Sequence, residues 1–219
     1  DNTTRAFGRF CSGSLSFREA GFDRPIYLTG EESDRDPRFG GTDAVFDGKG
    51  GLAVAIFDDR CHTLVKMGRF PWENTLARPD AGEWTVVMGM EDGPASLDNQ
   101  LYMYVGKKNR GAGASVLSRN GLDTGKLYTF VSDTPGQTSE LTFTSGSITG
   151  HWVELPDQTH VDEATLEAQT DAVGAFTLVR VEDGAWSKTD KNKFYFVTLF
   201  YGLFNVVHSA IQDSFNLSF

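Results

Sequence analysis

The stretch from Trp84 to Gly106, WTVVMGMEDGPASLDNQLYMYVG, decides the fold that we predict for this chain. Two runs rich in Val, Met and Tyr flank a segment of Gly, Pro, Asp and Asn, a pattern typical of two β-strands joined by a turn. Similar runs recur at PIYLTG (25–30), LAVAIF (52–57), HTLVKM (62–67), KLYTFVS (126–132), ELTFTSGSI (140–148), HWVEL (151–155), AFTLVRV (175–181) and KFYFVTLF (193–200). The sequence therefore predicts an all-β fold of antiparallel sheets.

One segment departs from the strand pattern. Residues 156–171, PDQTHVDEATLEAQTD, are enriched in Ala, Leu and Glu and show no strand alternation, which predicts a short helical or loop insertion. The spacing of the strands is compatible with the four-stranded blades of a β-propeller, and a β-sandwich is the competing architecture.

Charge and hydropathy exclude two classes of partner. The 219 residues carry a formal net charge of -10, whereas binding to a nucleic-acid backbone requires clustered Lys and Arg. The uncharged run at 194–207, FYFVTLFYGLFNVV, is shorter than the roughly 20 residues of a membrane-spanning helix. We therefore expect neither a nucleic-acid partner nor a membrane span.

Acidic residues repeatedly stand where a predicted strand ends. They are Glu31 and Glu32 in RPIYLTGEE (24–32), Glu73 in LVKMGRFPWEN (64–74), Glu91 and Asp92 in WTVVMGMEDG (84–93), and Glu182 and Asp183 in FTLVRVEDG (176–184). Asp and Glu beside Gly are also ordinary turn residues, which is the competing interpretation of each motif taken alone. Recurrence at four strand ends favours carboxylates that converge on one point, where their oxygens would hold hard cations such as calcium.

The two cysteines leave alternatives open. Cys11, in RFCSGS (9–14), adds a soft ligand near the first acidic pair, and a thiolate among carboxylates suits iron alongside calcium. Taken alone, Cys11 is more often a small buried apolar residue. Cys11 and Cys61 could also form a disulfide, which would exclude Cys11 as a ligand.

Seven stretches carry a resemblance to a known family. In order they are FCSGSL (10–15), IYLTGEES (26–33), MGRFPWEN (67–74), WTVVMGMEDG (84–93), QLYMYVGKK (100–108), NGLDTGKLY (120–128) and RVEDGAWSKTDKNKFYFVT (180–198). Together they resemble the PhoX-like family, which includes the PhoX alkaline phosphatases. The resemblance implies a six-bladed β-propeller, usually exported to the periplasm or the cell exterior, whose central channel holds an iron and calcium cluster that hydrolyses phosphate esters.

The resemblance also implies which residues form the site. By position, Cys11 matches the iron-binding cysteine, and Glu31 or Glu32, Glu73 and Glu182 match the metal-ligating glutamates. Asp92 and Asp183 are further candidate ligands, and Glu73 and Glu182 are the candidate catalytic residues. In this interpretation the clustered cations bind the phosphate oxygens and activate the nucleophile. The expected partner is a phosphate ester or another small molecule.

The extent of the resemblance predicts a fragment. Residues 1–198 would form roughly half of a propeller. Residues 199–219 would form an atypical tail that does not continue the last blade and instead packs as an irregular or helical segment. The first ten residues, DNTTRAFGRF, lack the apolar segment of a signal peptide, so we expect a chain that is cytosolic, already processed or missing its true start.

Half a propeller has consequences for activity and association. Its open blade edges favour self-association, and we expect the chain by itself to be inactive. The alternative function is a non-catalytic β-propeller module that calcium stabilises and that serves in binding or structure.

Overall fold

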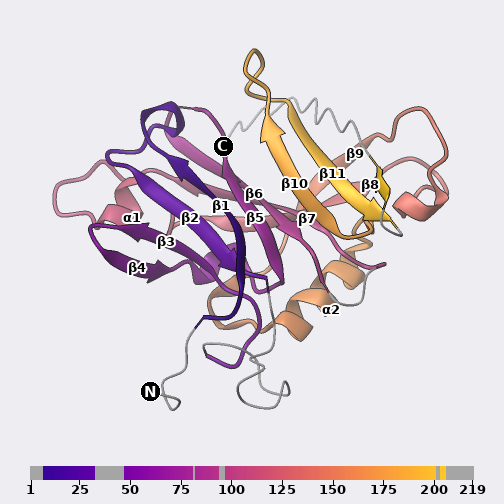
Figure 1. Cartoon of the computed structure of the whole chain (residues 1–219), viewed down its shortest axis with the longest axis horizontal. Helices are drawn as coiled ribbons and strands as arrows, with labels where there is room; N and C mark the ends of the chain where they lie inside the picture. The colour runs from indigo at the N-terminus through magenta and orange to yellow at the C-terminus, as the bar shows by residue number, and fades with distance from the viewer. Residues whose placement is uncertain (1–6, 33–46, 81, 94–96, 201–202, 206–219) are drawn as a thin grey trace.

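The computed structural model of the protein describes residues 7–32, 47–80, 82–93, 97–200 and 203–205. Its strands form three antiparallel sheets that follow one another along the chain (Figure 1). Within each sheet, strands that are hydrogen-bonded neighbours are also neighbours in sequence. Each sheet is therefore an up-and-down meander, as in a propeller blade.

The first sheet consists of β1 (Phe10–Ser16), β2 (Ile26–Glu31), β3 (Ala53–Phe57) and β4 (Arg60–Thr63). The second consists of β5 (Trp72–Ala77), β6 (Trp84–Glu91), β7 (Leu101–Lys107), β8 (Lys126–Ser132) and β9 (Gly150–Glu154), and the third of β10 (Val181–Trp186), β11 (Phe194–Phe200) and β12 (Leu203–Asn205). The helices are α1 (Val116–Arg119) and α2 (Glu163–Val173), with 3-10 turns η1 (Arg18–Ala20), η3 (Val65–Met67), η4 (Glu140–Thr142) and η5 (Gln158–His160). The predicted all-β fold is confirmed, and α2 lies at the predicted helical insertion.

The second sheet is covered on both faces, because successive side chains of a strand point to opposite faces. Val87 of β6 lies in an apolar core with Leu28 of the first sheet. Met88, the next residue, lies in a second core with Phe194 of the third sheet. The first and third sheets thus pack on opposite faces of the second, as neighbouring blades do.

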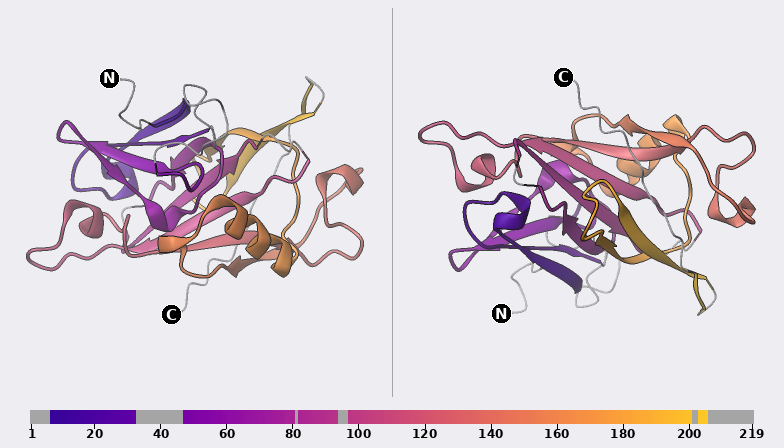
Figure 2. Two further views of the ribbon diagram at one scale, coloured as in Figure 1. Left: turned by 90° about the horizontal axis from the view of Figure 1, so that it is seen from below. Right: turned by 90° about the horizontal axis from the view of Figure 1, so that it is seen from above.

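The first strands of the three sheets lie next to one another. β1 contacts β5, and β5 contacts β10. Figure 2 shows the same three sheets in two further views. Residues on these three strands are therefore brought together although they lie far apart in the sequence.

Three of the predicted strands are wrong. Of residues 62–67, only the first two belong to β4, and Val65–Met67 form the 3-10 turn η3, in which the Met67 N–H donates to the Leu64 carbonyl at 2.9 Å. Residues 140–148 contain the 3-10 turn η4, because the Ser139 hydroxyl accepts a hydrogen bond from the Leu141 N–H at 3.2 Å and closes a local turn. Residues 175–180 are held by isolated β-bridges at Thr177 and Leu178 and not by a strand. β10 starts only at Val181, after Arg180 adopts a φ of 48°.

The predicted departure of the tail from the last blade is also wrong for the described residues beyond 198. β11 continues to Phe200, and Thr198 pairs with Asn205 of β12 in the antiparallel register. Aromatic and β-branched residues dominate 194–200, and such residues favour strands over helices. Residues 206–219 lie outside the described residues, and the division of the chain at 198 stays a prediction.

The edges and helices bear on two further expectations. β4 and β9 end the first and second sheets, and self-association through such edges stays a prediction. In the described part of the chain, no helix combines the length and the apolar character that crossing a membrane requires.

Trp72 fixes the distance between the first two sheets. Its side chain is 1% exposed and lies against two glycines, Gly30 of β2 and Gly89 of β6. A Cβ on Gly30 would lie 2.5 Å from Trp72 Cβ, and a Cβ on Gly89 would lie 2.6 Å from the indole ring. The indole therefore fits only because neither neighbour has a side chain.

We expect Gly30→Val to lower the free energy of unfolding by about 1–3 kcal/mol, because the added carbons overlap the rigid indole. Urea denaturation monitored by tryptophan fluorescence measures this change. Gly111→Ala, in an exposed turn where the added Cβ meets only the Asn109 amide oxygen, is the control and should change stability little. Equal effects of the two substitutions would contradict the packing role of Trp72.

Candidate metal centre

A β-bulge interrupts the first strand of each sheet near its start. The register shifts lie at residues 10–13 in β1, 72–74 in β5 and 181–184 in β10. Cys11, Glu73 and Glu182 lie within these bulges. A bulge redirects side chains out of the regular alternation, so each of the three adjacent strands can present one residue to a common point.

The second strands of the first two sheets add one carboxylate each at equivalent positions. The Glu32 N–H donates to the Arg9 carbonyl at 2.8 Å, and the Asp92 N–H donates to the Pro71 carbonyl at 2.9 Å. In the third sheet, Leu199 stands at this position and donates to the Arg180 carbonyl at 3.1 Å. The same backbone hydrogen bond therefore occurs in all three sheets, while an acidic side chain stands at this position in only the first two.

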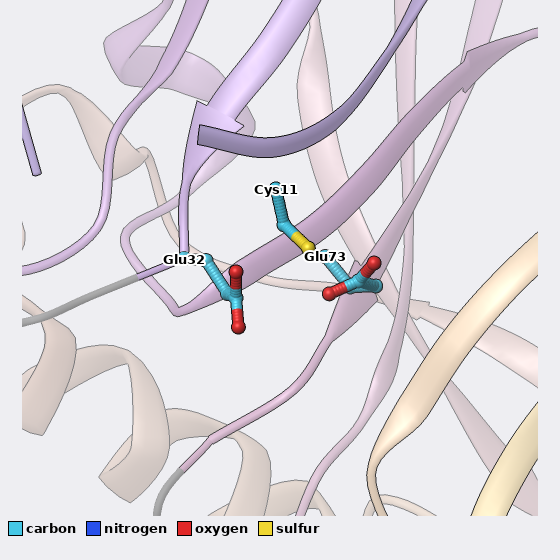
Figure 3. A group of neighbouring side chains, drawn as sticks. All are labelled: Cys11, Glu32 and Glu73. Atoms are coloured by element: carbon cyan, nitrogen blue, oxygen red, sulfur yellow. The ribbon is translucent and has the colours of Figure 1, made fainter. Parts of the chain in front are cut away.

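Five of the predicted ligands come together in two overlapping groups. The Cys11 sulfur and one carboxylate oxygen each of Glu32 and Glu73 lie within 4.8 Å of one another (Figure 3). An oxygen each of Glu73, Asp92 and Glu182 forms a second group with the same spacing. Two bonds to calcium at about 2.4 Å each span this distance, and Glu73 belongs to both groups.

Burial and mutual repulsion both raise the pKa of ionisable groups in this site. Cys11 is exposed, yet desolvation by its surroundings, followed by the neighbouring Glu32 and Glu73, raises the pKa of its thiol to about 12. Burial is also the main cause of the raised pKa of Glu73 and of Glu182, and the charge of Asp92 adds to both. A bound cation would reverse these shifts, because it favours the ionised ligands.

Two arginines border the site, and the sequence analysis missed both. Arg180 Nε and Nη2 donate to the two oxygens of Asp92 at 2.6 and 2.7 Å, and Nη2 lies 3.4 Å from Glu182 Oε1. Arg9 Nε donates to Glu32 Oε2 at 2.8 Å. Their only sequence signal is that they begin the stretches RFCSGS (9–14) and RVEDGAWSKTDKNKFYFVT (180–198).

The donor set fits iron and calcium. One thiolate among carboxylates provides a soft ligand for iron, and a group of oxygens alone suits calcium. Glu182 Oε1 is buried and accepts no hydrogen bond from the described residues, although Arg180 Nη2 lies 3.4 Å from it. A cation bound by the second group would give this oxygen a direct partner.

A family model described as alkaline phosphatase PhoX matches residues 58–211, which is more than half of the chain. This chain belongs to the PhoX alkaline phosphatase family. The match continues past Thr198, where the motif resemblance ended. No curated protein sequence matches the chain.

The fold of this chain is similar to that of a solved structure. Pseudomonas fluorescens PhoX in complex with vanadate, a transition state analogue, matches with a TM-score of 0.57 and 21% sequence identity over 86% of this chain. The chain spans 39% of the length of that protein. The three sheets are therefore part of a PhoX-like propeller.

Two of the predicted ligands lie outside both groups. Glu31 is fully buried, its Oε1 accepts the Gly8 N–H at 2.7 Å, and burial raises its pKa to about 7. Asp183 is exposed, and its Oδ1 accepts from Asn74 Nδ2 at 2.7 Å. Of the alternatives Glu31 and Glu32, the structure thus brings Glu32 into the site.

Glu91, at the end of β6, also has a separate place. Its side chain is 4% exposed, and Oε2 accepts the Gln100 N–H at 2.8 Å. It corresponds to Glu31, because Trp72 pairs with Glu91 as Phe10 pairs with Glu31. Both glutamates bind backbone instead of joining either ligand group.

A separate acidic group lies at α2. Oxygens of Asp98, Glu167 and Asp171 lie within 4.8 Å of one another, because residues four apart share one face of a helix. Burial is the main cause that raises the pKa of Glu167 to about 7, and Asp98, Asp171 and Glu163 add to the shift. The sequence analysis missed this group because Asp98 is remote from α2 in the sequence.

The two cysteines cannot pair in this fold. Cys11 lies on β1 and Cys61 on β4, at opposite edges of a four-stranded sheet, and both are free. Three strand spacings of about 4.8 Å separate these strands by roughly 14 Å, well beyond the Cα separation of a disulfide.

Mass spectrometry of the protein alkylated under non-reducing, denaturing conditions should therefore find Cys11 and Cys61 each as a modified thiol. Peptide mapping makes the assignment, and a fully reduced sample is the control. A Cys11–Cys61 cross-linked peptide would contradict the strand order of the first sheet.

We expect Glu167→Gln to stabilise the protein at pH 8. Since the folded-state pKa of Glu167 is raised to about 7 from an ordinary value of 4.5, its contribution to stability is present below pH 4.5 and is lost as pH rises through 7. Thermal melts from pH 4 to 8 in chelator test this, with a shallower decline expected for the variant. Glu154→Gln, at an exposed carboxylate beside Lys126, is the matched control. Parallel curves for wild type and Glu167→Gln would contradict the raised pKa.

Proposed function

We propose that the protein to which this chain belongs is a metal-dependent alkaline phosphatase that hydrolyses phosphate monoesters. The observation that carries the proposal is the pair of ligand groups that share Glu73. In the proposal, Cys11, Glu32 and Glu73 hold iron, and Glu73, Asp92 and Glu182 hold calcium. The structural similarity of this chain to Pseudomonas fluorescens PhoX in complex with vanadate, a transition state analogue, supports a phosphate-like ligand for this site.

The charge of the site requires the cations. Four carboxylates, those of Glu32, Glu73, Asp92 and Glu182, face the two guanidinium groups of Arg9 and Arg180, which leaves a net negative charge. A phosphate ester dianion would be repelled from such a site. Iron and calcium held by these ligands would supply positive charge for the phosphate oxygens and would activate water as the nucleophile.

The residues of the chain itself orient the reaction. Glu73 and Glu182, the predicted catalytic residues, would act as ligands, and Glu73, which belongs to both groups, would contribute to both metal positions. The Arg180 side chain is 37% exposed, so it has donors for a phosphoryl group in addition to those that Asp92 accepts. No serine or cysteine nucleophile is needed, and we place the enzyme in the periplasm or outside the cell, as is usual for the family.

Elemental analysis of the purified intact protein, combined with hydrolysis of p-nitrophenyl phosphate, tests the proposal. We expect both iron and calcium in the wild type. Glu73→Gln should lose both metals and at least about 100-fold in kcat/KM, Cys11→Ser should lose iron selectively, and Asp92→Asn should lose calcium selectively.

Asp183→Asn is the matched control, because Asp183 is a predicted ligand that the structure leaves outside both groups. It should keep both metals. Calcium without iron, a melting temperature raised by calcium and no hydrolysis would favour the alternative, a non-catalytic module stabilised by calcium. A loss of metal in Asp183→Asn as large as in Glu73→Gln would contradict the assignment of ligands.

A further inference from the structure

Arg180 reaches Asp92 from a backbone conformation that non-glycine residues rarely adopt. Its φ is 48°, in the left-handed region, and the chain turns here from the bridge at Leu178 into β10. Such a conformation persists only where the surrounding structure fixes it. The contacts on either side of Arg180 therefore decide where its guanidinium lies.

One carboxylate contacts both sides of this turn. Glu140 Oε2 accepts the N–H of Val179, the residue before Arg180, at 2.9 Å. Glu140 Oε1 accepts the hydroxyl of Thr198, which is fully buried and pairs with Val181, the residue after Arg180. The Glu140 N–H donates to the Thr177 carbonyl at 2.9 Å, so η4 is itself fixed to the same segment.

The first sheet shows the same contact made by a different residue. There Glu31 pairs with Phe10 and accepts the N–H of Gly8, two residues before Phe10. In the third sheet the position of Glu31 belongs to Thr198, whose side chain is too short to reach the equivalent N–H of Val179. Glu140, from the loop between β8 and β9, supplies the missing carboxylate and bridges the Val179 N–H and the Thr198 hydroxyl.

We propose that Glu140 is a positioning residue that holds Arg180 over Asp92 and Glu182 for binding of the phosphoryl group. This inference rests on the proposed function for the identity of the anion. Among the described residues, Glu140 makes no hydrogen bond or ion pair with a member of either ligand group, so in this proposal it acts through the backbone of Arg180 and not through the metals.

The test compares Glu140→Ala, Arg180→Ala and the double variant in the intact protein loaded with metal. Isothermal titration measures the affinity for inorganic phosphate, and we expect each single variant to weaken it about 10-fold. Since both substitutions remove the same guanidinium from the site, the double variant should lose no more than Arg180→Ala. Metal content should stay at the wild-type level in Glu140→Ala.

A second readout does not depend on phosphate. The Arg180 Nε–H resonance, assigned by its loss in Arg180→Lys, reports the hydrogen bond to Asp92 in protein labelled with 15N-arginine. It should shift and exchange rapidly in Glu140→Ala. Glu140→Gln should restore it, because the amide oxygen can accept from Val179 while the amide nitrogen donates to the Thr198 hydroxyl. Glu154→Ala, which removes an exposed carboxylate on β9, should leave it unchanged.

The outcomes separate the two proposals. An unchanged resonance and phosphate affinity in Glu140→Ala would overturn the positioning role, and so would additive losses in the double variant. If Glu140→Ala moves the resonance while the wild type binds no phosphate, the positioning of Arg180 stands and the proposed function fails.

Discussion

Repulsion among carboxylates that share a small volume is the constraint on which the site depends. Glu32, Glu73, Asp92 and Glu182 approach one another at neighbouring ends of three sheets. Burial is the main cause of the raised pKa of Glu73 and Glu182, and the neighbouring carboxylates raise it further. Arg9 and Arg180 offset part of this repulsion. The rest of the fold has to hold these groups together against their tendency to separate.

Apolar packing between the sheets, at a distance from the charges, holds these groups together. Trp72, between two glycines, fixes the first sheet against the second, and apolar cores cover both faces of the second sheet. The bulge next to Trp72 then determines where Glu73 points. Well-packed apolar cores thus set the geometry of a site that would be unfavourable by itself.

Equivalent backbone positions carry different side chains in the three sheets. The position of Glu31 in the first sheet is Glu91 in the second and Thr198 in the third, and only the third needs the additional carboxylate of Glu140. The repeat is therefore visible in registers and hydrogen bonds but not in residue identities.

Most strands and the acidic strand ends could be predicted, because alternation and turn composition are local properties of the chain. The strand predicted at 140–148 was wrong because a short-range cap at Ser139 outweighed the propensity of its residues, and the tail beyond 198 stayed in the sheet because β11 had a partner strand to extend along. The acidic motifs and Cys11 pointed to a metal-binding chemistry without saying which residues would meet.

By itself, the sequence determined the fold class, the family and the candidate ligands. Only the tertiary structure decided that Glu32 and not Glu31 lies near Cys11 and that Asp183 stays outside both groups. It also decided that Arg180 donates to Asp92 and that Glu140 accepts the N–H of Val179. Neighbouring residues on a strand point to opposite faces, so a choice between adjacent acids depends on register and bulges, which long-range pairing sets.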